Sequence, residues 1–266
     1  MRPRWAIMVW AIIAKDVRMI MRNRQVWLPM LVLPLMMSVV VPALYSVELR
    51  DSVRNMQKAR EVMWLVPAAA NLTSNMERMY YMGLNYMFPS LFLMIPLVAG
   101  NIIGAGCLVG EKESRTLETL LYTPVTLPQL FFGKLVAAFV PAYAVTLCSF
   151  GLFLVTVNVT GPATNVGFPI VRWLLLITTV CPALILLALA AMVVISAYAS
   201  TFQAAQQLAS LVVLPVTMLI LAPMSGHVAV ADEQLVLGAA LLFALDLAVL
   251  RFAASRFTAE RLVEGM

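Results

Sequence analysis

The chain has 266 residues, of which 62% are hydrophobic and only 12% are charged. A soluble domain carries about twice that charged fraction, and uncharged runs longer than about 18 residues are typical of membrane-spanning helices. Composition therefore excludes an ordinary soluble protein. The net charge of +5 fits orientation in a bilayer better than binding of nucleic acid, because the basic residues stand next to apolar runs.

Residues 1–25 join a basic start to an apolar stretch. Met1 to Arg4 holds two arginines, and the run from Trp5 to Ala14 is apolar. Both a secretory signal peptide and an interfacial helix begin in this way. Apolar residues resume at Val17 and no small-x-small cleavage site is evident. We therefore expect a helix that lies in the membrane interface.

The first membrane span is expected at 26–45, and its three prolines are tolerated where neighbouring groups satisfy the freed carbonyls. Residues 46–84 carry mixed charge but keep a helical spacing of apolar residues, so we expect an extracellular loop with one or two short helices. The second span follows at 88–108. It contains Gly100 and Gly104, whose spacing lets helix backbones approach closely, and we expect tight packing within one subunit.

The segment 110–124 is the one charged, helix-like stretch between two long apolar runs. Glu111 and Glu113 stand in its first turn, where carboxylates oppose the positive end of the helix dipole. The spacing places Glu111, Arg115 and Glu118 on one face, where they pair weakly.

Another face of the same segment is apolar and consists of Leu117, Leu120 and Leu121. Pro124 disfavours helix at the residue before it and closes the segment. The pattern predicts a short amphipathic helix at a membrane surface. Its acids outnumber its basic residues, so a protein partner is a better match than anionic lipid.

The rest of the chain supplies four further spans. A turn-rich loop and a glutamine-containing polar patch divide the long uncharged runs. The expected spans are 135–157, 171–195, 208–222 and 235–253. Six spans place both termini on one side of the membrane. Twelve of the 18 basic residues then lie on the side of the termini and of 110–124, and six lie on the other, which predicts cytoplasmic termini.

The sequence lacks the residue patterns of several enzyme classes. There is no Gly-x-x-x-x-Gly-Lys-Ser/Thr loop to hold nucleotide phosphates, so we expect no catalytic residue and no ATP bound by this chain. His227 is the only histidine, and the three cysteines show no metal-ligand spacing. We expect neither a metal site nor a cofactor.

The motif from Glu111 to Val125, followed by Gly133 and Lys134, resembles the loop between the second and third spans of type 2 ABC transporter permeases. The family pattern reads Glu-Arg-Glu, Thr-Leu-Glu, a leucine run, then Thr-Pro-Val, and this chain departs from it at Arg115, where glycine is common. The resemblance implies an all-α integral membrane protein with six transmembrane helices, an N-terminal interfacial connecting helix and a cytoplasmic coupling helix. The implied coupling residues are Glu111, Glu113, Arg115, Thr116, Leu117, Glu118, Leu120, Leu121 and Pro124.

The resemblance also implies the partners. The coupling helix would bind an ABC ATPase subunit that carries ATP and Mg²⁺, and a second copy or a related permease would complete the substrate pathway in the bilayer. The chain would be an exporter permease in the inner (plasma) membrane of a prokaryote, and nothing in the sequence names the cargo.

Asp246 is the one acid placed inside an expected span, and such a group is a functional candidate by default. A structural hydrogen bond or ion pair, with Arg251 near the inner interface, competes with a role in substrate or ion passage. Two other functions remain open on these residues: a scaffold that merely recruits an ATPase, and an ion-coupled secondary transporter that uses Asp246.

Overall fold

The computed structural model describes residues 14, 18, 24–52, 72, 74–113, 127–163, 166–225 and 230–256. Within these ranges the regular structure is entirely helical. Six helical segments are long and apolar enough to cross a membrane, which confirms the predicted fold class: Val26–Leu49, Asn75–Cys107, Phe132–Thr160, Ile170–Ser196, Phe202–Met224 and Asp232–Arg251. The interfacial helix expected at 1–25 lies almost wholly outside the described residues.

Several segments consist of more than one helical element. The first contains α2 (Arg24–Leu35), η1 (Met36–Val40) and α3 (Val41–Ser52), and the second contains α5 (Asn75–Met82), η4 (Gly83–Met87), α6 (Phe88–Phe92) and α7 (Met94–Leu108). The third is α10 (Leu127–Thr160), and the fourth contains α11 (Ile170–Leu175), η5 (Leu176–Val180) and α12 (Cys181–Ser196). The fifth contains α13 (Phe202–Leu221) and η6 (Ala222–Ser225), and the sixth is α14 (Asp232–Arg256).

The helix that carries the second span begins earlier than the residue expected for that span. It starts at Asn75, within the segment 46–84 where one or two short helices were expected, and it leads into the span expected from Phe88. The cause is a capping box: Ser74 Oγ accepts from the Met76 N–H, and Glu77 Oε2 accepts from the Ser74 N–H at 3.0 Å. Where the bilayer boundary falls on this helix stays a prediction.

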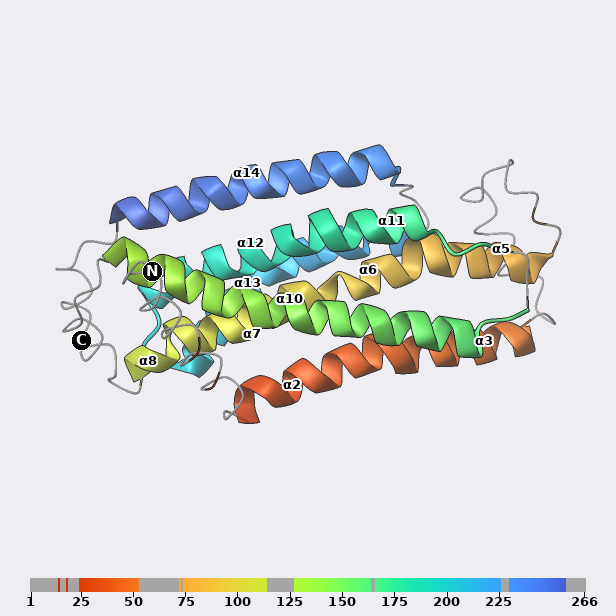
Figure 1. Ribbon diagram of the computed structural model, residues 1–266, viewed down its shortest axis with the longest axis horizontal. Coiled ribbons are helices and arrows are strands. Elements are labelled where there is room, and N and C mark those ends of the chain that lie inside the picture. The colour runs from red at the N-terminus through yellow and green to blue at the C-terminus, as the bar shows by residue number, and fades with distance from the viewer. Residues whose placement is uncertain are drawn as a thin grey trace, which may run out of the picture.

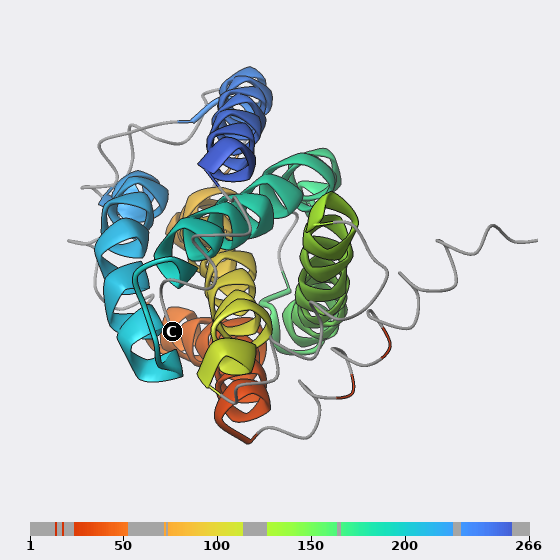
Figure 2. The ribbon, with the colours of Figure 1, turned by 90° about the vertical axis from the view of Figure 1, so that its left-hand side faces the viewer.

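The start of α2, the end of α14 and the short helix α8 (Gly110–Glu113) lie at one end of the bundle, and α3, α5 and α11 extend to the other (Figure 1). Seen from the α8 end, α7 runs between α10 on one side and α12 and α13 on the other (Figure 2). The second and fourth spans are mostly buried, while the fifth and sixth are mostly exposed. The bundle therefore has α7 and α12 at its centre.

Three of the spans contain a π-helical turn, and each turn has the same sequence pattern. A polar residue stands four positions before a proline: Ser38 and Pro42, Asn85 and Pro89, and Thr178 and Pro182. Proline lacks an N–H, and its ring clashes with the carbonyl four residues back. The helix widens, so that the Phe88 N–H bonds the Gly83 carbonyl and the Cys181 N–H bonds the Leu176 carbonyl.

Two of these turns provide carbonyl oxygens to donors on other spans. Leu84 O, released in η4, accepts from Trp173 Nε1 at 3.2 Å. Ile177 O, released in η5, accepts from the Tyr143 hydroxyl at 3.3 Å. Because a backbone polar group in lipid must find its partner within the protein, each bond satisfies a carbonyl and ties two spans together.

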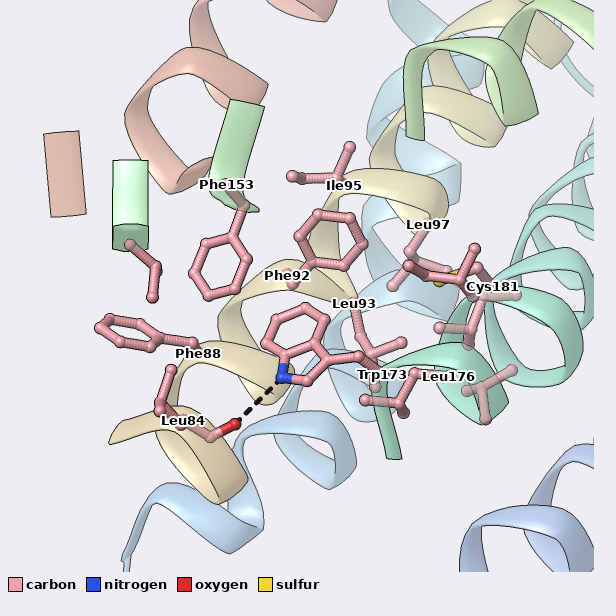
Figure 3. Packing of buried hydrophobic residues seen from close by; sticks show 14 of the residues in the cluster. Leu84, Phe88, Phe92, Leu93, Ile95, Leu97, Phe153, Trp173, Leu176 and Cys181 are labelled. Atoms are coloured by element: carbon pink, nitrogen blue, oxygen red, sulfur yellow. Dashed lines mark hydrogen bonds between the residues drawn. The ribbon is translucent and has the colours of Figure 1, made fainter. Parts of the chain in front are cut away.

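An aromatic cluster fills the bundle near η4, and Trp173 is at its centre. Trp173 is fully buried and stacks on Phe153, with 4.5 Å between the ring centroids. Phe92 meets the indole edge-on at 5.4 Å. Figure 3 shows these rings together with the bond from Trp173 to Leu84. The cluster joins the second, third and fourth spans.

The predicted close approach at Gly100 and Gly104 is present, and it lies within one chain. A Cβ placed on Gly100 would meet Ile185 O at 3.1 Å, and one placed on Gly104 would meet Leu189 Cδ2 at 3.0 Å. The two glycines thus let α7 pack tightly against α12, in agreement with the expected role within one subunit.

Candidate coupling site at the α8 end of the bundle

The structure describes only the first turn of the predicted coupling segment. The helix α8 contains Glu111 and Glu113. The other predicted coupling residues lie outside the described residues, and their contacts stay predictions: Arg115, Thr116, Leu117, Glu118, Leu120, Leu121 and Pro124.

α8 continues α7 almost without interruption. The Val109 N–H bonds the Ala105 carbonyl at 2.9 Å, and the Glu113 N–H bonds the Val109 carbonyl at the same distance. Helical bonding therefore runs from the second span through Glu113, although Val109 itself is a turn residue. Backbone hydrogen bonds therefore link α8 to α7.

The Glu113 carboxylate binds the N-terminus of another span. Its Oε2 accepts from the Phe202 N–H, the first of α13, at 2.9 Å. The first turn of a helix has N–H groups without helical partners. Thr201 Oγ1 accepts from the Ala204 N–H, so two of these donors are satisfied. A carboxylate at this position also opposes the helix dipole, which contributes about 0.3–1 kcal/mol at an exposed site.

Lys134 makes the complementary contact on the opposite side of α7. Its side chain is buried, and Nζ donates to Cys107 O, at the C-terminal end of α7, at 3.0 Å. The sequence pattern had marked Lys134 only as part of the family motif and as an inside charge. The sequence holds one signal for this contact: a single lysine follows the predicted coupling helix and stands directly before a long apolar run.

An apolar cluster joins α7, α12 and α13 at this end of the bundle. Ala105 and Val109 meet Met192 and Ile195 of α12, together with Ala205 of α13. Among the described residues of α13, only Ala205 and Ala209 are buried, and Phe202 packs against the cluster. The start of α13 is therefore attached to the bundle by this apolar cluster and by the Glu113 bond.

Asp246 lies elsewhere, on α14 within the sixth span. Its side chain is 2% exposed, and the structure describes no hydrogen-bond partner for either carboxylate oxygen. Arg251, the expected partner, is exposed. The expected structural bond is thus not seen among the described residues, and a part in the pathway stays a prediction.

A second buried polar group, Asn101 of α7, was not singled out by its sequence pattern. It is 8% exposed and lines a cavity of about 10 Å³ together with residues of α12 and α13. A space of this size holds about one water molecule. It is too small to be a substrate site in this conformation.

Comparison with known protein families identifies the family of this chain. A family described as ABC-2 family transporter protein matches residues 10–254. A search of curated proteins finds no matching relative. The family match spans most of the 266 residues, including all six membrane-spanning segments and the region of α8. The chain therefore belongs to the ABC-2 family of transporter membrane proteins.

Proposed function

We propose that this chain is the permease subunit of an ATP-driven exporter, and that a separate ABC ATPase binds segment 110–124. The supporting observation is the position of α8. It continues the most buried span at the end of the bundle that also holds the start of α2 and the end of α14. A partner that contacts α8 therefore acts on the centre of the bundle.

The proposed mechanism follows from the packing. Closure of the ATPase subunits on ATP displaces α8, and α7 moves with it because the backbone bonds are continuous through Val109. Since α7 packs on α12 through Gly100 and Gly104, the two central helices move together. The pathway would then change from inward to outward access between this chain and a second copy or a related permease. Such a change requires an interaction with the partner that differs between the two states.

Orientation and location are part of the same proposal. The excess of basic residues on the side of the termini supports cytoplasmic termini and a cytoplasmic α8. Only on that side can α8 meet an ATPase that uses cellular ATP. We therefore place the protein in the plasma membrane of a prokaryote, with ATP and Mg²⁺ bound by the partner.

Co-purification with the ATPase tests this proposal. Truncating central apolar anchors of an interface commonly costs about 2 kcal/mol or more of binding, so Leu120→Ala combined with Leu121→Ala should remove most of the bound ATPase. The control pair Leu147→Ala and Leu152→Ala, on the exposed face of α10, removes the same atoms elsewhere and should have no effect. Equal retention of the ATPase by wild type and both pairs would refute the proposal.

The two alternatives give different results in the same preparation. A scaffold would retain the ATPase, but the thiol accessibility of its spans would not change when ATP is added. A secondary transporter would move its substrate with no ATPase present, and transport would depend on Asp246.

A further inference from the structure

We propose that Glu113 is a positioning residue that carries the motion of the coupling segment to the fifth span, α13. This inference rests on the proposed function above. The contact that supports it is the bond from the Phe202 N–H to Glu113 Oε2 at 2.9 Å, between residues that lie 89 positions apart in the chain. It is a bond between the first turn of the coupling segment and the first turn of another span.

Glu113 moves with the second span. It belongs to the helical bonding that continues from Ala105 through Val109, so its backbone follows α7 and α8 as one unit. Its carboxylate, in contrast, is bound to α13. Any displacement of α8 must therefore either pull the start of α13 along or break this bond.

Besides this bond, the start of α13 is attached by apolar contacts. Ala205 and Ala209 are buried, and Phe202 is partly buried and packs against two apolar clusters of the bundle. Thr201 satisfies the Ala204 N–H from within α13 itself and adds no link to another span. The Glu113 bond is thus the polar connection that the structure describes between α8 and the inner end of α13.

Lys134 makes a second contact between helices, from α10 to α7. It holds the C-terminal end of α7 to α10 through the carbonyl of Cys107, while Glu113 holds the N-terminal end of α13 to α8. The Glu113 carboxylate lies at a helix N-terminus, where a negative charge is favoured. One movement of α8 then reaches the third and the fifth spans on opposite sides of α7 (Figure 2).

This role differs from the one that the sequence predicts for Glu113. As a surface charge that meets the ATPase, Glu113 would contribute to recruitment, and its loss would weaken binding. As a positioning residue, it would leave recruitment unchanged and affect what happens in α13 after ATP binds. The two roles therefore differ in a measurable way.

The backbone donor itself can be deleted. Phe202→Pro removes the N–H at the first helical position, where proline fits best. Thr201, the residue before it, is extended with φ −127° and ψ 153°, which is the conformation that proline requires of its predecessor. Phe202→Ala removes the same side chain but keeps the N–H, so comparison of the two variants isolates the bond.

Amide hydrogen exchange of the permease alone, in lipid nanodiscs, tests the contact. Loss of a bond to a charged group should speed exchange in the first turn of α13 by about fivefold to tenfold in Glu113→Ala. Phe202→Pro should speed it at Ala204 and Ala205 more than Phe202→Ala does, because both variants lose the packing of the phenyl ring and only Phe202→Pro also loses the bond. The double variant Glu113→Ala with Phe202→Pro should be no worse than either single change. Unchanged exchange in Glu113→Ala would overturn the proposal.

A fluorophore on the complex tests the relay. An environment-sensitive label is attached at Gln203→Cys, on the exposed first turn of α13, or at Phe132→Cys, on the exposed start of α10, after the three native cysteines are replaced. In the wild type, ATP should change the signal at both labels. Glu113→Ala keeps the apolar anchors Leu120 and Leu121, so the ATPase should remain bound through them. The change at Phe132→Cys should then persist, while the change at Gln203→Cys is lost. Glu113→Gln, which keeps an acceptor oxygen, should restore part of it.

The outcomes separate this inference from the proposed function. Loss of ATPase binding in Glu113→Ala, with unchanged exchange in α13, would favour the surface-charge role and overturn the inference. A persistent ATP response at Gln203→Cys in Glu113→Ala would also overturn it. Absence of any ATPase on the wild-type chain would instead count against the proposed function, and the exchange experiment on the permease alone would still decide whether the contact exists.

Discussion

Substitution of Gly100 by alanine should separate the two central helices. The added Cβ would lie 3.0 Å from Ala188 Cβ, 3.1 Å from Ile185 O and 3.3 Å from Ile185 Cα. Carbon atoms normally pack at about 3.5–4.0 Å, and two of these three neighbours are backbone, which no rotamer change can move. Overpacking of this kind typically costs about 1–3 kcal/mol. The gain in helix propensity over glycine offsets about 0.5–1 kcal/mol, which leaves a net loss of roughly 0–2.5 kcal/mol.

Gly151 provides the matched control. It lies on the exposed side of α10, and nothing is within 4 Å of an added Cβ, so Gly151→Ala should gain about 0.5–1 kcal/mol. In a chain of this size each kcal/mol shifts the apparent Tm by about 2–4 °C. We therefore expect thermal unfolding in detergent to show a fall of a few degrees for Gly100→Ala and a small rise for Gly151→Ala. Ala188→Gly should rescue Gly100→Ala only in part, because Ile185 remains. Equal Tm values for the two alanine variants would refute the packing account.

Three further predictions concern the aromatic cluster, the buried acid and the topology. Trp173→Phe removes the donor to Leu84 O and should cost about 0.6–2 kcal/mol of stability. Trp27→Phe, on the partly exposed α2, should leave the Tm unchanged. Equal Tm shifts for the two variants would contradict the role of the carbonyl that η4 releases. Asp246→Asn should keep most transport if the residue is structural, because the amide has the shape of the carboxylate and buries no charge. Loss of transport with intact assembly and ATPase binding would place Asp246 in the pathway. The topology is tested with single cysteines at Ser114 and Thr73, after Cys107, Cys148 and Cys181 are replaced. The two should react with an impermeant thiol reagent from opposite sides of the membrane. Labelling of both from outside would exclude the six-span topology.

The overall fold is predictable from this sequence because every span is an apolar run of sufficient length. Hydropathy alone places six crossings, and the structure contains six segments that can make them. The spacing of Gly100 and Gly104 predicts close packing in the same direct way. These are properties of neighbouring residues, which a single sequence shows.

Other features of the fold depend on more than hydropathy. The early start of α5 depends on the capping pair Ser74 and Glu77, a signal that is present in the sequence but is easily masked by the surrounding charges. The π-helical turns follow from prolines. A hydropathy profile shows that a span tolerates these prolines but does not show how they change the helix. Their released carbonyls matter only because Trp173 and Tyr143 lie beside them in space.

The site was predicted less completely than the fold, for a physical reason. The motif identifies the coupling segment, but the bond from Phe202 to Glu113 joins residues 89 positions apart. Its donor is a backbone N–H, which every residue except proline has, so no residue type marks it in the sequence. The contact between Lys134 and Cys107 O likewise involves a main-chain acceptor. Contacts of this kind follow from the placement of helix ends, which periodicity does not reveal.

Site-specific photo-cross-linking tests most directly whether segment 110–124 meets an ATPase. A photoreactive amino acid is introduced at Leu117 or Leu120, and a control is placed at Val155, which is 62% exposed near the C-terminal end of α10. Irradiation of membranes should join the permease to a protein with an ABC ATPase sequence, as identified by mass spectrometry, from Leu117 and Leu120 but not from Val155. Absence of that product from both coupling positions, in membranes where the ATPase is present, would contradict the account.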